Sequence, residues 1–112
     1  VILRQETQQA IEDIQVIRSF RTRGTEDIFN RVNSRDARRT CHDQVWPVAR
    51  RKLDQLNAVV SLESLRVPPG SHLESLTGDR RGQHSIRINS QYRVCFVWED
   101  DGPAHVEITD YH

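Results

Sequence analysis

The spacing of apolar residues changes near residue 70, and this change limits the folds that the chain can adopt. Before the chain breaker Pro68-Pro69-Gly70, apolar residues recur at helical offsets, and after it they alternate with polar residues. Helices followed by consecutive strands are typical of an α+β domain, in which helices cover one face of an antiparallel sheet. A chain of 112 residues has room for one such domain.

The first part of the chain predicts a strand and two helices. Residues 16–20 read as a short strand. A short helix opens near Thr25, which is placed to act as its N-cap, and a second helix is expected over residues 43–58. Pro47 fits the first turn of that helix, where a missing N–H costs little. Residues 31–39 are rich in Arg, Asn and Ser and are expected to form a loop.

The second part predicts an antiparallel meander. Strands are expected over residues 84–89, 92–98 and 104–109, after an arm over residues 72–76. Ile86 and Ile88 should face one side of their strand, with Ser85, Arg87 and Asn89 on the other.

The net charge is zero, but the charges are unevenly distributed. Residues 16–98 carry 15 Lys and Arg against 8 Asp and Glu, whereas residues 99–112 carry five acids and no Lys or Arg. A basic body beside an acidic end suggests a polyanionic partner. Fifteen of the sixteen cations are Arg, whose planar fork matches phosphate oxygens, although a GC-rich genome would give the same ratio.

Several classes of protein fit the sequence poorly. Cys41 and Cys95 are far apart and lack metal-ligand spacing, so we expect free thiols and neither a metal nor a cofactor, with a structural disulfide as the alternative. No apolar run is long enough for a membrane span, and residues 1–14 lack the apolar stretch of a signal peptide. These features predict a cytoplasmic protein.

Asp110-Tyr111-His112 follow the last predicted strand directly. A carboxylate, a phenol and an imidazole can supply the charge partner, proton donor and proton acceptor of an acid–base site. Beside many arginines, such a trio suggests chemistry on a phosphate ester. The alternatives are an ordinary fraying end and, for Tyr111, stacking on a base.

A series of short motifs occurs in a recognisable order over residues 16–112. They are Val16-Ile17-Arg18-Ser19-Phe20, Ala49-Arg50-Arg51-Lys52-Leu53, Leu65-Arg66-Val67-Pro68-Pro69-Gly70, Leu73-Glu74-Ser75-Leu76-Thr77-Gly78-Asp79-Arg80, Gly82-Gln83-His84-Ser85-Ile86-Arg87-Ile88-Asn89, Tyr92-Arg93-Val94-Cys95-Phe96 and Val106-Glu107-Ile108-Thr109-Asp110-Tyr111-His112. In this order the chain resembles the HigB branch of the RelE-like toxins of bacterial toxin–antitoxin modules. The resemblance implies a small RelE-like domain, with an N-terminal strand and two helices packed on a twisted antiparallel sheet.

The resemblance also implies a domain boundary. Val16 stands where the family's first methionine usually stands. We therefore expect residues 1–15 to be an extension outside the fold and residues 16–112 to be the toxin domain.

The activity implied by the resemblance is that of a ribosome-dependent mRNA endonuclease. Such toxins enter the ribosomal A site, beside 16S rRNA, and cleave mRNA there without a metal, by attack of a ribose 2′-OH on the adjacent phosphate. The implied inhibitor is a HigA-like antitoxin with a helix-turn-helix.

Site residues follow from the same resemblance. The expected catalytic residues are Arg87, Arg93, Asp110, Tyr111 and His112, with the two arginines placed to stabilise the phosphorane. The expected RNA-binding residues are Arg80, Arg81 and Lys52. Glu74 and His72 are further candidates, since some relatives have a histidine at the position of Glu74 and a lysine near Thr77. His84 shares the side of Ile86 and is expected to be packed.

Other interpretations of the same residues remain open. Each arginine could be an ordinary solvated side chain. A ParE-like toxin shares the fold but poisons gyrase, and a decayed toxin would only bind its antitoxin.

Overall fold

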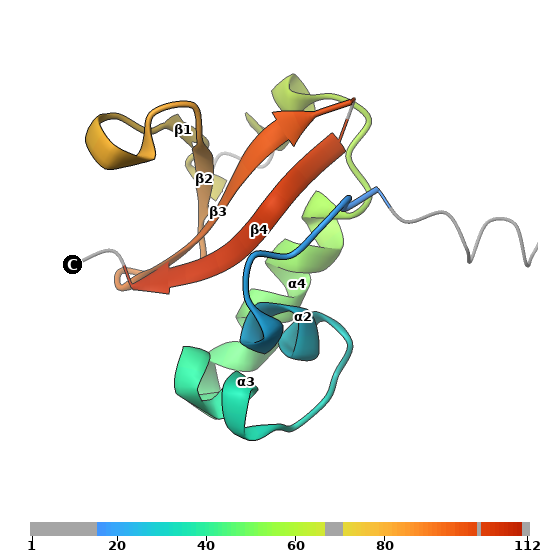
Figure 1. Cartoon of the computed structure of the whole chain (residues 1–112), viewed down its shortest axis with the longest axis vertical. Helices are drawn as coiled ribbons and strands as arrows, with labels where there is room; N and C mark the ends of the chain where they lie inside the picture. The colour runs from blue at the N-terminus through green and yellow to red at the C-terminus, as the bar shows by residue number, and fades with distance from the viewer. Residues whose placement is uncertain (1–15, 67–70, 101, 111–112) are drawn as a thin grey trace, which may run out of the picture.

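The computed structural model describes residues 16–66, 71–100 and 102–110, and it confirms the α+β class (Figure 1). Four antiparallel strands form one sheet in the order β1-β2-β3-β4, which is the predicted meander. The strands are β1 (Glu74–Ser75), β2 (His84–Arg87), β3 (Tyr92–Glu99) and β4 (Gly102–Asp110).

Of the three α-helices in the described residues, two contact the sheet and the third packs against one of them (Figure 1). The three helices are α2 (Arg23–Phe29), α3 (Arg35–Thr40) and α4 (Trp46–Leu56). Short 3₁₀ turns are η1 (Asp43–Val45), η2 (Leu62–Arg66) and η4 (Gly78–Arg80). The second predicted helix is confirmed as η1 plus α4, and Pro47 lies in the first turn of α4 as predicted. None of the helices in the described ranges is long and apolar enough to cross a membrane.

Two predictions for the first part of the chain are wrong. Residues 35–40 form α3 rather than a loop, because the hydroxyl of Ser34 caps that helix by accepting from the Ala37 amide at 3.0 Å. The N-cap of α2 is Thr22 rather than Thr25. The Thr22 hydroxyl accepts from the Thr25 amide at 3.3 Å.

The predicted strand over residues 16–20 is reduced to a single parallel bridge between Phe20 and Val106. The segment still runs beside β4, since the Arg18 amide donates to the Pro103 carbonyl at 2.7 Å. The amides of Val16 and Ile17 instead donate to Oδ1 of Asn57, each at 3.0 Å. Because this side chain takes their donors, these residues do not join the ladder of the sheet.

The core lies between the sheet and α4. Ile86, Val94, Phe96 and Val106 are fully buried on the sheet's helix-covered face, and Leu53 is fully buried on α4. Strand alternation then directs the intervening side chains to the opposite face of the sheet. That face is where the polar residues of the site gather.

Candidate functional site

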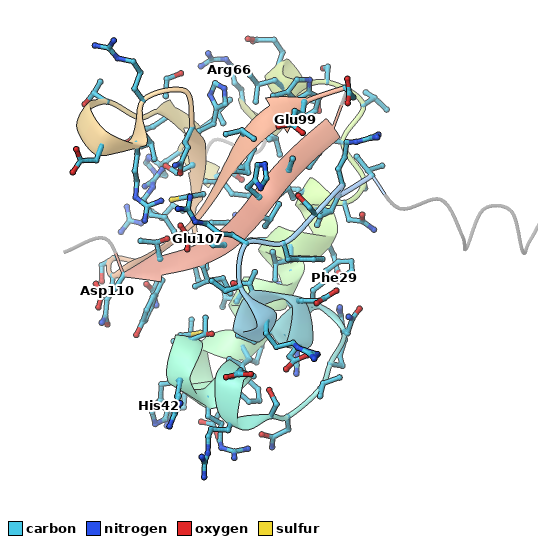
Figure 2. All side chains as sticks on the ribbon, in the orientation of Figure 1. Phe29, His42, Arg66, Glu99, Glu107 and Asp110 are labelled. Carbon is cyan, nitrogen blue, oxygen red and sulfur yellow. The ribbon has the colours of Figure 1, made fainter. Side chains whose placement is uncertain are left out.

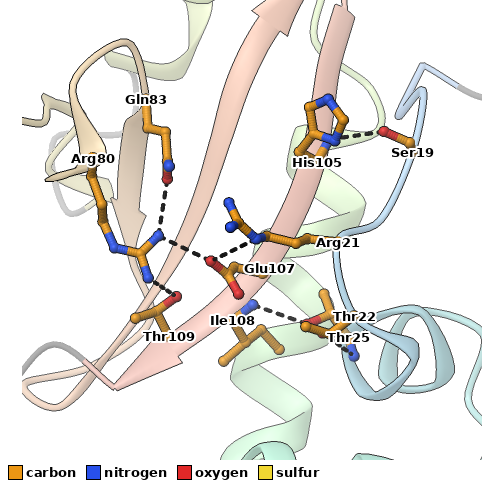
Figure 3. A network of polar contacts seen from close by, with 10 residues as sticks. All are labelled: Ser19, Arg21, Thr22, Thr25, Arg80, Gln83, His105, Glu107, Ile108 and Thr109. Carbon is orange, nitrogen blue, oxygen red and sulfur yellow. Dashed lines mark hydrogen bonds and ion pairs between the residues drawn. The ribbon is translucent and has the colours of Figure 1, made fainter.

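The sheet face directed away from α4 carries two rows of paired residues, which we call the polar face. One row is Glu74, Ser85, Cys95 and Glu107, and the next is Arg87, Arg93 and Thr109. The rows follow from strand register, because residues paired across antiparallel strands point to the same side. Figure 3 shows part of this face, with α4 behind the sheet.

Arg93 is buried in the polar face, with 6% of its surface exposed. Its Nε donates to the Ser85 hydroxyl at 2.6 Å, and its Nη2 donates to the His72 carbonyl at 2.6 Å. His72 has a φ of 48°, which is uncommon for a residue other than glycine. Through these two hydrogen bonds Arg93 anchors the arm before β1 to the sheet.

Arg87 is the cross-strand partner of Arg93, so the structure brings the two predicted phosphate-binding arginines together. The Nε of Arg87 donates to the Asn89 carbonyl at 3.1 Å, and the side chain is half-buried. The acid beside this pair is Glu74, whose carboxylate lies 4.0 Å from Arg93 Nη2 and is 52% exposed. Two guanidinium groups facing one exposed carboxylate leave this end of the polar face positive.

A second cluster surrounds Glu107, which the sequence analysis did not identify as a site residue. Arg80 Nη1 donates to the Glu107 carboxylate at 2.9 Å and to the Gln83 side-chain carbonyl at 3.0 Å (Figure 3). Arg21 Nε lies 3.9 Å from the same Glu107 oxygen. The hydrogen bond that Arg80 donates to Glu107 raises the pKa of Arg80. One sequence signal was available, namely an acid at the polar position between Val106 and Ile108.

A pocket of about 340 Å³ lies against this second cluster. It is lined by Arg21, Asp79, Arg80 and Gln83. The pocket is connected to the polar face because Arg80 Nη2 also contacts the Thr109 hydroxyl at 3.5 Å.

Two predicted RNA-binding residues lie apart from the polar face or at its margin. Lys52 belongs to α4, and its ammonium donates to the buried Ser71 hydroxyl at 3.2 Å. Burial and the neighbouring Arg51 lower the pKa of Lys52. Arg81 is exposed directly after η4.

Asp110 is not brought to the arginine pair by its strand. It is the cross-strand partner of Tyr92, so by alternation it extends from the sheet face opposite Arg93. Gln91 donates to its carboxylate at 3.0 Å, and Figure 2 places Asp110 at the end of the sheet. Burial, together with the charges of Cys41 and Asp110, raises the pKa of Tyr92. Tyr111 and His112 lie outside the described residues.

His84 is packed, as predicted. Its ring lies 5.8 Å from that of Phe96, and burial lowers its pKa. Within residues 16–66, 71–100 and 102–110, no group of three or more His, Cys, Asp or Glu side chains is arranged to hold a metal ion.

Comparison with known proteins decides the family. A family model described as the RelE-like toxin of the type II toxin–antitoxin system HigB matches residues 18–112. The chain belongs to this HigB-like toxin family. The resemblance drawn from the motifs is thereby confirmed, and the polar face is the sheet surface of a HigB-like toxin.

Two relatives of this HigB-like chain have been compared over shorter stretches. Toxin HigB-1 of Vibrio cholerae serotype O1 is 48% identical over 50 residues, which is 45% of this chain and 53% of the relative. An uncharacterised protein of Haemophilus influenzae is 39% identical over 57 residues, which is 51% of this chain and 56% of the relative. The chain thus spans about half the length of the curated relatives it matches.

Proposed function

We propose that this HigB-like protein is the toxin of a type II toxin–antitoxin system and that it cleaves mRNA on the ribosome. The observation that carries the proposal is the adjacent pair Arg87 and Arg93 on the polar face, with Glu74 beside it. Such a cluster suits a reaction in which negative charge accumulates on a phosphate.

The reaction that these groups suit is transfer within the RNA backbone. The ribose 2′-oxygen attacks the adjacent phosphorus and loses its proton to a base, and the bond from phosphorus to the 5′-oxygen breaks. The products are a 2′,3′-cyclic phosphate and a 5′-hydroxyl, which takes up a proton from an acid. Glu74, being half exposed beside Arg93, is suited to the role of base.

Each charged group has a separate proposed role. Arg87 would contact the phosphorane directly, whereas Arg93 would position the arm that carries Glu74, because its donors reach Ser85 and His72. Tyr111 and His112 are proposed to protonate the leaving oxygen. Asp110 would act as a charge partner of Tyr111 and His112 and would not contact the phosphate.

Binding to the ribosome and to an antitoxin completes the proposal. Arg81 would contact RNA backbone in the A site, Arg80 would contact RNA from its place beside Glu107, and Lys52 would face 16S rRNA from the helical side. A HigA-like helix-turn-helix antitoxin is the proposed inhibitor. The protein would act in the cytoplasm, where its ribosomal target lies.

The test is cleavage of a defined mRNA with and without ribosomes. Wild type should cleave only when ribosomes are present, Arg87→Ala should lose this activity, and Arg66→Ala should keep it because Arg66 pairs with Glu63 on η2. Efficient cleavage of free RNA, or full toxicity of Arg87→Ala, would contradict the proposal. Loss of DNA supercoiling during growth arrest would point instead to a gyrase poison.

A further inference from the structure

The pocket beside Glu107 has no role in the cleavage chemistry proposed above, although its walls are rich in hydrogen-bonding groups. Its lining comes from two distant parts of the chain, since Asp79 and Arg80 belong to η4, Gln83 follows it, and Arg21 precedes α2. The Arg21 amide donates to the Val106 carbonyl at 2.9 Å, which fixes its backbone beside β4. The volume of about 340 Å³ falls at the lower end of small-molecule sites.

The charges around the pocket balance. Arg80 and Arg21 both approach the Glu107 carboxylate, and Asp79 supplies a second acid. These four residues together carry no net charge, whereas Arg87, Arg93 and Glu74 carry one net positive charge. An anion such as phosphate favours the positive cluster. A neutral set of donors and acceptors suits an uncharged, polar ligand such as a nucleobase.

The donor and acceptor pattern selects among the bases. A carboxylate only accepts hydrogen bonds, and a guanidinium only donates them. Guanine presents two neighbouring acceptors, O6 and N7, and carries donors at N1 and at the N2 amine. Unlike guanine, adenine and the pyrimidines do not combine one edge that has two neighbouring acceptors with another edge that has two neighbouring donors. Guanine is therefore the base that can satisfy Asp79 and an arginine together.

We propose that this pocket binds a guanine base of the mRNA, an inference that rests on the proposed nuclease function. Asp79 would accept from guanine N1–H and N2–H, and Arg21 would donate to O6 and N7. Arg80 is held by Glu107, Gln83 and Thr109, so its plane offers a fixed surface on which the base can stack.

The position of the pocket gives this contact a consequence for cleavage. Arg80 reaches Thr109, and Thr109 is the cross-strand partner of Arg93. The pocket and the arginine pair therefore lie on one face. A guanine held in the pocket would fix which phosphate of the mRNA reaches the arginine pair, so the pocket would determine sequence preference.

Nucleotide binding tests the pocket without requiring cleavage. The full chain is titrated by NMR with GMP, IMP and AMP, which share one phosphate, so differences in affinity report the base. GMP should bind about tenfold more tightly than AMP, as expected for one bidentate contact. IMP lacks the N2 amine and should fall between the two.

Matched variants assign the preference to the pocket. Asp79→Asn should reduce the GMP preference to less than about threefold, given that an amide replaces one acceptor with a donor. Asp43→Asn is the control, since Asp43 is also exposed but lies on η1. Equal binding of GMP and AMP to wild type, or a GMP preference that survives Asp79→Asn, would overturn the inference.

A cleavage assay distinguishes failure of the guanine pocket from failure of the proposed nuclease function. Ribosome-bound mRNAs are compared in which single guanines near the cleaved bond are replaced by adenine. If mRNA is cleaved but wild type shows no GMP preference, the guanine pocket fails and the nuclease function stands. If GMP is preferred but ribosome-bound mRNA stays intact, the nuclease function fails and the pocket stands.

Discussion

Arg93 and Arg80 lie on the same face of one sheet but are held by different kinds of partner. Arg93 is 6% exposed and donates to a hydroxyl and a carbonyl, from Ser85 and His72. The Arg80 side chain is 34% exposed and donates to the Glu107 carboxylate at 2.9 Å. The Glu74 carboxylate lies 4.0 Å from Arg93 and is 52% exposed, so it offsets the charge of Arg93 less than the Glu107 carboxylate, at 2.9 Å and 15% exposed, offsets that of Arg80.

This difference divides the polar face into two functional halves. The half around Arg93 keeps a positive charge and suits a phosphate in which negative charge develops. The half around Arg80 is neutral and presents fixed donors and acceptors. A surface that both binds a backbone and reads a base needs both halves, since phosphate contacts carry no sequence information.

The largest expected effect is that of Arg87→Ala on cleavage. If Arg87 contacts the phosphorane as proposed, removing its guanidinium should slow single-turnover cleavage by about 100-fold. The free energy of unfolding should change by less than about 0.5 kcal/mol, because Arg87 is only half-buried and bonds to one carbonyl. Cleavage within threefold of wild type would show that the positive half does not carry the chemistry.

Arg93→Ala should instead act mainly on stability. It leaves the buried Ser85 hydroxyl and the His72 carbonyl without this donor, which should lower the free energy of unfolding by about 2 kcal/mol. Urea denaturation measures the loss. Arg80→Ala is the matched variant and should cost no more than about 1 kcal/mol, as its ion pair is partly exposed. Equal losses for the two variants would remove the distinction between the halves.

Glu107→Gln should convert the neutral half into a positive one. Arg80 and Arg21 would then be available to phosphates, and the salt dependence of binding to single-stranded RNA should steepen by about 0.7 in log–log slope. Fluorescence anisotropy with a short RNA at several salt concentrations measures this slope. An unchanged slope would mean that Glu107 does not control the charge of this half.

The smallest expected effect concerns the two cysteines, of which Cys41 is buried in the core and Cys95 is buried on the polar face. Burial raises the pKa of Cys41 to about 11 and also raises the pKa of Cys95, where Arg80 and Arg93 oppose the rise. The unfolded chain therefore loses its thiol protons first, and stability should fall as pH increases from about 9 to 11. At pH 9.5 the Cys41 contribution to this loss should be less than about 1 kcal/mol.

Cysteine variants sharpen that measurement. Stability curves of Cys41→Ala and Cys95→Ala are compared with wild type between pH 7 and pH 10. Cys41→Ala should remove more of the alkaline loss, since the arginines of the polar face stabilise the Cys95 thiolate. The reverse order would show that these arginines do little to stabilise the Cys95 thiolate on the polar face.

Much of the fold follows from local sequence signals. Periodicity predicted α4 and the strands β2, β3 and β4, because each buries residues at a regular spacing. The helix α3 was missed although Ser34 precedes it as a cap, because its polar residues show no apolar stripe. The strand expected over residues 16–20 failed for a tertiary reason, namely that Asn57 takes the amides of Val16 and Ile17.

The site was less accessible to sequence reasoning. The adjacency of Arg87 and Arg93 follows from a short hairpin and could be predicted. The contact between Arg80 and Glu107 spans 27 residues and depends on how η4 folds over the sheet. The burial of Arg93 depends on the arm carrying His72, which the alternation of β3 does not reveal.

The attachment of residues 18–21 to β4 has a consequence for how the molecule assembles. The Arg21 amide donates to the Val106 carbonyl, and the Ile108 amide donates to the Thr25 hydroxyl across 83 positions of sequence. Contacts between such distant segments form late, after local hairpins such as β2 with β3. The charged rim contributed by Arg21 should therefore be the final piece to arrive during refolding, so a half-folded chain would lack one wall of the pocket.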